Sequence, residues 1–418
     1  MLRRILSPDR QDYEANIWKS YAFQFLYSFQ LWWPIWVIYL TDYRGFSLTQ
    51  VGTLEALFWI VIILSQLPTG LIADRFGRKL SLMLAGVFTT AAILVFGVAS
   101  NYWIVLVSYV AWGIGLTFAS GADAALVFDS LKAVGKEQHY QRVAGIGWGM
   151  FSLGTLAGLL AGAPLAAVTN LSFPVVISSV TCALTIVVAW SFTEPPLHEG
   201  IRPSYRELVV ESARVIWRSP PVRSMLLLAA VMMASVNATI VFSQPFLDHH
   251  NVPVRLFGVA QTPMRIGAII GALAVHRLTM RLGMRWTLVG AALVTISSYA
   301  LLGGWNSVWA FGATTTILLA NGLVVPATTD YLNQRIPSGQ RATILSARQL
   351  INSIIIAAGL PALGAIADRV SLQAVFWTSS AFLGVTAPLA LVLWLRADAE
   401  EASATSSLPA EVGAAPAR

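Results

Sequence analysis

The sequence predicts an all-α polytopic membrane protein with twelve transmembrane helices in two pseudo-symmetric six-helix bundles. Three observations lead to this fold class: an apolar composition, a regular series of long apolar segments, and an internal repeat. Of the 418 residues, 56% are hydrophobic and only 11% are charged, and the mean hydropathy is +0.67. A soluble domain has about a quarter of its residues charged, so most of this surface must face lipid. Because backbone polar groups in lipid must be satisfied internally, long apolar segments are expected to be helices.

The apolar segments follow one another along the chain, and each is long enough to cross roughly 30 Å of hydrocarbon. Those of the first half cover residues 17–41, 48–73, 79–99, 102–131, 138–167 and 171–193. Those of the second half cover residues 222–247, 252–276, 284–303, 307–331, 339–367 and 371–396. We therefore expect an N-terminal bundle over 1–193, a cytoplasmic central loop over 194–221, a C-terminal bundle over 222–396 and a disordered cytoplasmic tail over 397–418.

The central loop contains apolar residues at helical spacing among charges, namely Val209, Ala213 and Ile216. This pattern fits an amphipathic helix at the membrane surface, and a solvated linker fits nearly as well.

The two halves resemble each other in sequence. The stretch from Val51 to Glu55 (V-G-T-L-E) matches the stretch from Phe257 to Gln261 (F-G-V-A-Q) at an offset of 206 residues. The same offset places Gly77 on Gly283, and two further matches follow in the same order. These matches indicate a duplicated six-helix unit, in which a substrate site is expected near the midplane between the repeats.

Basic residues lie almost entirely on one side of the expected membrane. With both termini on the inner side, 22 Lys and Arg residues are inside, and only Arg44, Arg255 and Arg369 are outside. The positive-inside rule therefore places both termini in the cytoplasm and the protein in the cytoplasmic (cell inner) membrane. The net charge of +7 is scattered among short loops, which argues against a nucleic-acid partner.

A ten-residue motif, G-L-I-A-D-R-F-G-R-K, runs from Gly70 to Lys79 between the second and third segments. It closely resembles the loop that characterises the major facilitator superfamily, and a degenerate copy stands at 281–285. The resemblance implies two bundles that rock around a central cavity by alternating access. It also implies that Asp74 and Arg78 pair with Asp129 and latch the bundles together in the outward-open state.

The expected latch comprises Gly70, Asp74, Arg75, Gly77, Arg78, Lys79 and Asp129. Gly70 is expected to permit close helix packing and Gly77 a tight turn. In the alternative interpretation Arg75, Arg78 and Lys79 only follow the positive-inside rule. That interpretation does not explain Asp74 or the glycines. The sequence lacks the arginine pattern of the fourth helix and the Gly-Pro pair of the fifth helix found in the drug/proton antiporter branch. These absences weigh against proton antiport.

Four ionisable residues fall inside expected spans, where charge is costly and function is the default hypothesis: Glu55, Asp123, Arg265 and Arg348. Arg265 is the deepest, and it is expected either to pair with Glu55 or Asp123 or to contact an anionic substrate. Asp123 is a candidate proton carrier because burial favours the neutral carboxyl group. A structural partnership of Asp123 with Arg265 or Arg348 is equally compatible with the sequence.

Polar residues in other spans complete the set of substrate or coupling candidates: Gln24, Tyr27, Gln30, Asn237, Gln244 and Asn321. The spacing of three from Gln24 to Gln30 predicts one helical face, and the family resemblance implies that this face lines the cavity. The alternative is that the amides only satisfy neighbouring helices. Trp32, Trp33 and Trp36 near the outer end are expected to belong to the interfacial aromatic belt.

The favoured function is secondary active transport of a small amphipathic organic molecule, with efflux as the direction, because aromatic and apolar residues outnumber polar ones in the spans. Uptake or facilitated diffusion of an organic anion held by Arg265 is an alternative. A non-transporting sensor or lipid-handling scaffold is another. No nucleotide-binding loop is present, and we expect neither enzymatic activity, nor a cofactor, nor a metal. The expected partners of a monomeric protein are the substrate, membrane lipid and, as a candidate coupling ion, the proton.

Overall fold

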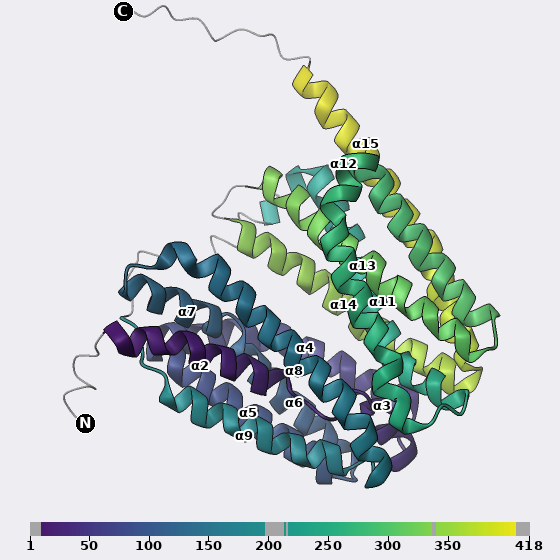
Figure 1. Cartoon of the computed structure of the whole chain (residues 1–418). Helices are drawn as coiled ribbons and strands as arrows, with labels where there is room; N and C mark the ends of the chain where they lie inside the picture. The colour runs from purple at the N-terminus through teal and green to yellow at the C-terminus, as the bar shows by residue number, and fades with distance from the viewer. Residues whose placement is uncertain (1–9, 197–212, 215, 337–339, 407–418) are drawn as a thin grey trace, which may run out of the picture.

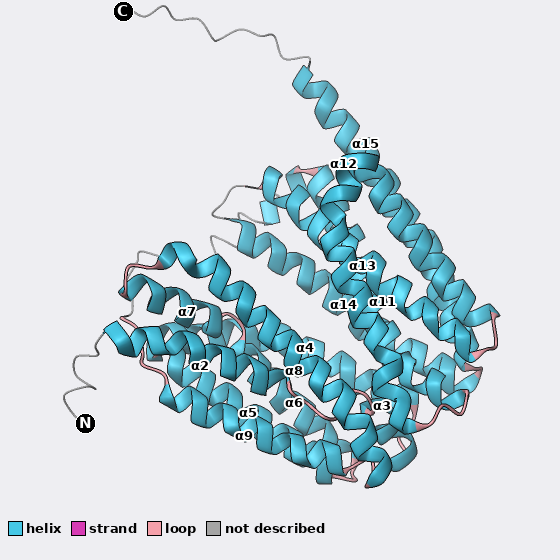
Figure 2. Ribbon diagram, in the orientation of Figure 1, coloured by secondary structure: helices cyan, strands magenta, loops and turns pink. Residues whose placement is uncertain are grey.

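The computed structural model describes residues 10–196, 213–214, 216–336 and 340–406. Every regular element in these ranges is a helix (Figure 2). The first half contains α2 (Arg10–Ser28), α3 (Trp36–Ile38), η1 (Tyr39–Tyr43), α4 (Leu48–Phe76), α5 (Arg78–Val98), α6 (Tyr102–Ala119), α7 (Ala122–Ala133), η2 (Glu137–His139), α8 (Tyr140–Val168) and α9 (Phe173–Ser191). The second half contains α11 (Pro220–His249), η3 (Val254–Leu256), α12 (Phe257–Gly304), η4 (Val308–Phe311), α13 (Gly312–Arg335), α14 (Arg341–Arg369) and α15 (Leu372–Ser406).

Ten helices in the described part of the chain are long and apolar enough to cross a membrane. One of them extends from Val254 to Gly304, which is 51 residues and about twice the length that a single crossing needs. It divides at Gly283, whose φ of 78° and ψ of 159° interrupt the helix. The expected count of twelve is reached when α12 is counted as two crossings and the interrupted segment from α2 to η1 as one.

The two halves form separate bundles that meet at one end and diverge at the other (Figure 1). The start of α2 and the end of α15 lie at the end where the bundles diverge, here called the terminal end, and the opposite end is called the closed end. Contacts between the halves are made by α4 with α14, by α8 with α12, and by α3 with α11.

Glycines allow the backbones of the two halves to come together at the closed end. A side-chain carbon at Gly52 of α4 would overlap the carbonyl of Leu360 in α14, and one at Gly364 of α14 would overlap the carbonyl of Leu48. The same applies to Gly258 of α12 against the carbonyl of α8 residue Leu159. In lipid the hydrophobic effect does not drive helices together, so their association depends on close packing. Small residues permit this packing because they let two helix backbones come near each other.

The first apolar segment differs from the continuous helix expected over 17–41. Helix α2 ends at Ser28, and the chain is non-helical as far as Ile35. Pro34 has no N–H to give to a helix, and Leu31 N donates instead to Ser178 Oγ at 2.9 Å. The predicted aromatic belt is wrong for two of its residues, because Trp32 and Trp36 are only 2% and 3% exposed.

The end of the second half also differs from expectation. The sequence predicts a disordered tail after Arg396, whereas α15 continues to Ser406. Asp398 of this extension pairs with Arg335 of α13 at 2.7 Å and accepts a hydrogen bond from Tyr331 Oη at 2.6 Å. These contacts, with the high helix propensity of Ala and Glu, explain the longer helix. Residues 407–418 lie outside the described residues, and so does Val209 of the expected amphipathic stretch, whereas Ala213 and Ile216 are helical.

Candidate transport site

The interrupted segment between α2 and α3 presents backbone groups that side chains of the second half satisfy. Val37 N donates to Gln244 Oε1 of α11 at 2.8 Å, and Gln244 Nε2 donates to Trp33 O at 2.9 Å. Gln261 of α12 donates to Pro34 O at 3.0 Å. Gln244 is fully buried. In this structure its amide therefore joins the two halves.

Gln30 lies within the interruption, so the prediction of one helical face shared with Gln24 and Tyr27 is wrong. Its Nε2 donates to Tyr27 O at 3.0 Å and lies 3.3 Å from Cys182 Sγ on α9, and its Oε1 accepts from Trp32 Nε1 at 3.1 Å. The helical spacing argument fails because the helix ends before Gln30. Gln24 lies against the backbone of α8 at Gly147, where a side-chain carbon would meet its amide.

An aromatic cluster stands beside the interruption in the first half. The rings of Trp32 and Trp33 stack with centroids 4.6 Å apart, and Trp112 of α6 meets Trp32 edge-on at 5.2 Å. Trp112 also stacks on Phe58 of α4 at 4.3 Å. Trp32 and Phe58 are 2% and 5% exposed and belong to the core, whereas Trp33 and Trp112 are partly exposed.

Arg265 of α12 and Glu55 of α4 lie on helix faces that are turned towards the opposite half. Arg265 is one turn deeper than Gln261, whose side chain reaches the first half, and Glu55 is within one turn of Gly52, which contacts the second half. Both side chains are half-buried. Among the described residues no carboxylate lies within 4.0 Å of Arg265, so the expected pairing with Glu55 or Asp123 is not formed in this structure.

Asp123 stands in the first turn of α7, directly after a break in the fourth apolar segment. The break is at Gly121, whose φ of 82° lies in the left-handed region. The carboxylate accepts a hydrogen bond from Ala124 N at 2.7 Å, as acidic groups at helix N-termini commonly do. The sequence places Asp123 inside a continuous helix, and the structure instead places it at a helix start.

The remaining candidates in the second half lie on α11, α13 and α14. Asn237 Nδ2 donates to Met233 O of its own helix at 3.3 Å. Arg348 of α14 donates from Nη1 to Thr329 Oγ1 of α13 at 2.8 Å. Asn321 Oδ1 of α13 and Arg348 Nε are buried without a hydrogen-bond partner in the described structure. Unpartnered polar atoms in an apolar setting are costly, which keeps both residues as candidates for ligand contact.

The latch residues gather at the terminal end of the first half. Arg78 lies 3.7 Å from Asp74 and 3.4 Å from Asp129, so the structure brings together the three residues that the resemblance implies. Their function as a latch stays a prediction. Arg75 instead extends over the ring of Phe76. Among the described residues nothing lies within 4 Å of the position a Gly70 side-chain carbon would take, so the close packing expected there is absent while the halves diverge.

Two contacts between segments far apart in the chain were missed from the sequence. The carboxylate of Glu194, just after α9, accepts from Arg78 N and Lys79 N at 2.7 Å each and caps α5 next to Gly77, whose φ is 101°. At the closed end Asp368 of α14 accepts from Leu48 N, Thr49 N and Thr49 Oγ1 at 2.9, 2.8 and 2.6 Å. Each acid follows or ends an apolar segment, but nothing local in the sequence indicates its partner.

The family model of the Major Facilitator Superfamily matches residues 21–360 and, in a second match, residues 241–416. The chain belongs to the major facilitator superfamily. It is 22% identical over 380 residues to the uncharacterized MFS-type transporter YxaM of Bacillus subtilis (strain 168), covering 86% of this chain and 87% of that one. A shorter match to the sucrose permease of Escherichia coli is 35% identical over 60 residues, or 14% of each chain.

Solved structures of transporters share the fold of this superfamily member. A mutant of the nucleoside transporter NupG superposes with a TM-score of 0.78 at 12% identity, covering 91% of this chain and 100% of that one. A bacterial homolog of the human lysosomal transporter Spinster, in its inward-facing and unoccupied conformation, gives 0.67 at 17% identity, covering 94% and 98%. At these identities the likeness shows the fold alone. The chain is thus a multi-pass membrane transporter with the superfamily fold.

Proposed function

We propose that this protein is a secondary active transporter that exports a small amphipathic organic molecule by alternating access. The observation that carries the proposal is the position of Arg265 and Glu55, one turn beyond the contacts that join the halves, on helix faces turned towards the opposite half. Charges at this depth are costly unless they serve a ligand or a coupling ion.

The amphipathic character of the substrate follows from the balance of side chains near the interrupted segment. The partly exposed rings of Trp33 and Trp112 offer an apolar surface. Several amides there are already occupied by protein partners, Gln30 and Gln244 among them. A sugar-like ligand would need many free polar partners, so an organic molecule with one charged or polar group and an apolar body is the better match.

The direction of opening follows from the charge asymmetry. With both termini in the cytoplasm, as the distribution of Lys and Arg predicts, the terminal end at which the halves diverge is cytoplasmic. The closed end, held by Asp368, Gln244 and Gln261, is then extracellular. In this arrangement the protein is in an inward-facing state, which would receive a substrate for export from the cytoplasm or from the inner leaflet.

A second candidate function is uptake or facilitated diffusion of an organic anion. Its support is the absence of a carboxylate within 4.0 Å of Arg265 in the described structure, which leaves that guanidinium available for an anionic group. A non-transporting scaffold is less compatible with the chain, because a static protein has no use for the motif from Gly70 to Lys79.

The test of the proposal is a two-part experiment on purified full-length protein. Thermal stabilisation is measured across a panel of amphipathic cations, neutral amphipaths and organic anions, and each stabilising compound is then assayed for flux in proteoliposomes. We expect stabilisation and counterflow by amphipathic compounds. Flux restricted to small hydrophilic anions would favour the second candidate, and stabilisation without any flux would contradict transport altogether.

A further inference from the structure

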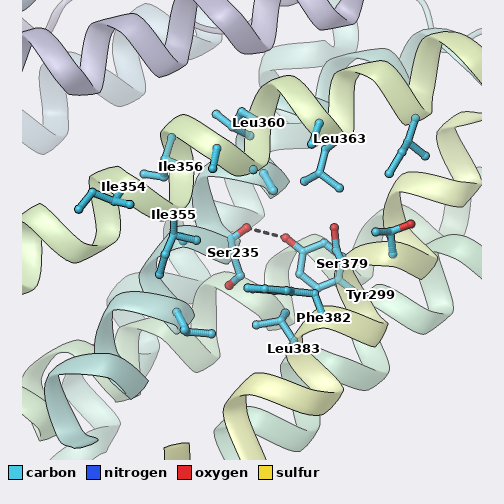
Figure 3. Close-up of a pocket in the computed structure, with 18 residues that line it drawn as sticks. Ser235, Tyr299, Ile354, Ile355, Ile356, Leu360, Leu363, Ser379, Phe382 and Leu383 are labelled. Atoms are coloured by element: carbon cyan, nitrogen blue, oxygen red, sulfur yellow. Dashed lines mark hydrogen bonds between the residues drawn. The ribbon is translucent and has the colours of Figure 1, made fainter. Parts of the chain in front are cut away.

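An apolar pocket of about 500 Å³ lies within the second half, between α11, α14 and α15 (Figure 3). Ile355 and Leu363 of α14 form one wall, and Leu383 of α15 forms the other. The floor consists of the small side chains of α11, among them Ala234 and Ala238. A volume of this size is in the range of pockets that bind small ligands.

Three of the four polar side chains that line this pocket, those of Ser235, Tyr299 and Ser379, are hydrogen-bonded within the protein. Tyr299 Oη donates to Ser235 O (Figure 3). It also lies 2.7 Å from Thr239 Oγ1. The pocket therefore has almost nothing to offer to a water molecule or a polar ligand, because such a guest needs several hydrogen-bonding partners. A hydrocarbon chain forms no hydrogen bonds, so it can enter this pocket without leaving a polar group unpaired.

Exposed apolar side chains at the mouth of the pocket indicate that it opens towards the bilayer. Ile354 of α14 and Phe382 of α15 line the pocket and are 58% and 48% exposed. Both lie well inside apolar spans, those from Thr343 to Arg369 and from Leu372 to Glu401. At this depth the surrounding medium is hydrocarbon, so the molecules that reach the mouth are acyl chains or ligands that carry one.

The same face of α14 carries two polar residues on the terminal side of the pocket. Arg348, Asn352, Ile355, Leu363 and Ile366 share this face because they follow at multiples of three to four residues. From Arg348 to Ile366 the face extends over 18 residues, or roughly 27 Å at about 1.5 Å per residue. One helix face therefore has a cationic end and an apolar end.

The polar end has unused hydrogen-bonding capacity. Thr329 engages only one nitrogen of Arg348, and Arg348 Nε is buried without a partner in the described structure. Asn352 is 1% exposed, and its Oδ1 is likewise without a partner among the described residues. Arg348 Nε is a buried donor without a partner, which indicates that an acceptor group of a ligand normally sits there.

We propose that this face of α14 binds a single-chain amphiphile with an anionic head group, the head at Arg348 and the chain in the apolar pocket, entered laterally from the bilayer. The inference rests on the proposed function, because it names a substrate class for the same transporter. It assigns that class to a site within the second half and to Arg348, separate from Arg265.

The test uses the full-length protein in lipid nanodiscs and palmitate that carries a photoreactive diazirine at the end of its chain. Labelled peptides are identified by mass spectrometry, with unlabelled palmitate and uncharged hexadecanol as competitors. We expect labelling within 354–366 and 378–383. Ala362→Trp places a large side chain at an exposed position that lines the pocket. It should lower the apparent affinity of both competitors at least tenfold, about 1.4 kcal/mol. Ala381→Trp, which is exposed on α15 outside the pocket, should leave both unchanged.

The head-group contact is tested separately with Arg348→Gln. This variant should weaken competition by palmitate about tenfold or more and spare hexadecanol, whereas Arg348→Lys should retain palmitate competition. If Arg348→Gln weakened competition by palmitate and by hexadecanol equally, Arg348 would have only a structural role. Labelling unchanged by Ala362→Trp, or spread evenly over lipid-facing peptides, would overturn the pocket assignment. If labelling fails while other amphipathic compounds are still transported, the inference is wrong and the proposed function stands.

Discussion

At the scale of single residues, the charged side chains inside the spans and at their ends have different partners. Arg78 is engaged by two carboxylates, whereas Arg265 has none within 4.0 Å in the described structure. Asp123 lies at the start of α7, and its carboxylate accepts from a backbone amide. A permanent positive charge without an acid must be satisfied by water, ligand or lipid, so Arg265 is the residue whose replacement is most informative about the substrate.

Replacing Arg265 with Gln removes the permanent charge and keeps some length and hydrogen bonding. If Arg265 holds an anionic group, affinity for anionic ligands should fall by about 1.5–3 kcal/mol while neutral ligands are spared. Binding is measured by ligand-dependent thermal stabilisation. Arg255→Gln is the control, because it removes the same charge at an exposed position at the closed end. A stable Arg265→Gln protein with unchanged affinity for every ligand would contradict the role in binding.

Replacing Asp123 with Asn tests proton coupling. A carboxyl group that exchanges a proton during transport would make flux respond to an imposed pH gradient, and the amide should abolish that response. Flux is measured in proteoliposomes with and without the gradient. Asp42→Asn, an exposed carboxylate at the closed end, serves as the control. Gradient-driven flux in the Asp123 variant would show that another group carries the proton.

At the scale of elements, interruptions in helices provide the contacts between the halves. The break from Phe29 to Ile35 frees backbone groups that Gln244 and Gln261 bind. In the same way, the N-terminus of α4 is bound by Asp368 of α14, which adds a favourable charge to unpaired backbone N–H groups. These contacts must break if the closed end is to open, so their strength sets the balance between the two states.

Replacing Asp368 with Ala removes three hydrogen bonds from the start of α4. Loss of a helix N-cap costs about 0.5–2 kcal/mol, and a loss of about 1 kcal/mol would shift the conformational balance roughly fivefold towards opening of the closed end. The shift is measured as the distance between spin labels at Asn101 and Asn306, which are exposed at the closed end of different halves. Asp42→Ala is the matched control. An unchanged distance distribution in Asp368→Ala would show that the glycine contacts alone hold this end.

At the scale of the whole molecule, the two halves are joined at one end and diverge at the other (Figure 1). Gly70 and the ion pairs of Arg78 lie at the terminal end. In the opposite state this end would have to close, and Gly70 would then permit the close approach that its surroundings do not require here.

Asp74→Asn and Asp129→Asn should each lower the transport rate with little change in ligand affinity or expression, because they alter the balance of states without touching the ligand contacts. Rates are measured by counterflow and affinities by thermal stabilisation. Arg75→Gln, whose side chain lies over Phe76, is the control within the motif and should transport at the wild-type rate. Wild-type rates in both acid variants would leave only the positive-inside interpretation of the loop.

The orientation of the molecule is tested with reporters. A reporter fused after Ser406 should be cytoplasmic, and one inserted between Asn251 and Pro253 should be extracellular, because basic residues favour the inner side by 22 to 3. Activity of an alkaline phosphatase fusion measures exposure to the outside, and a fluorescent protein fusion reports the inside. An extracellular C-terminus would reverse the direction proposed for transport.

The sequence by itself determined the membrane class and the approximate spans, because segment length and apolarity depend on neighbours in the chain and on the solvent around it. The grouping of Asp74, Arg78 and Asp129 was implied by the resemblance of the loop motif to the family. Only the tertiary structure decided the break before α3, the orientation of Gln30, the cap that Asp368 places on α4 and the pocket between α14 and α15. Each of these depends on a polar group or a backbone that finds its partner far along the chain, as Gln244 does 207 residues from Val37. A pattern of hydrophobicity records that a position is buried, but the partner that satisfies a buried polar atom is set by how the helices pack.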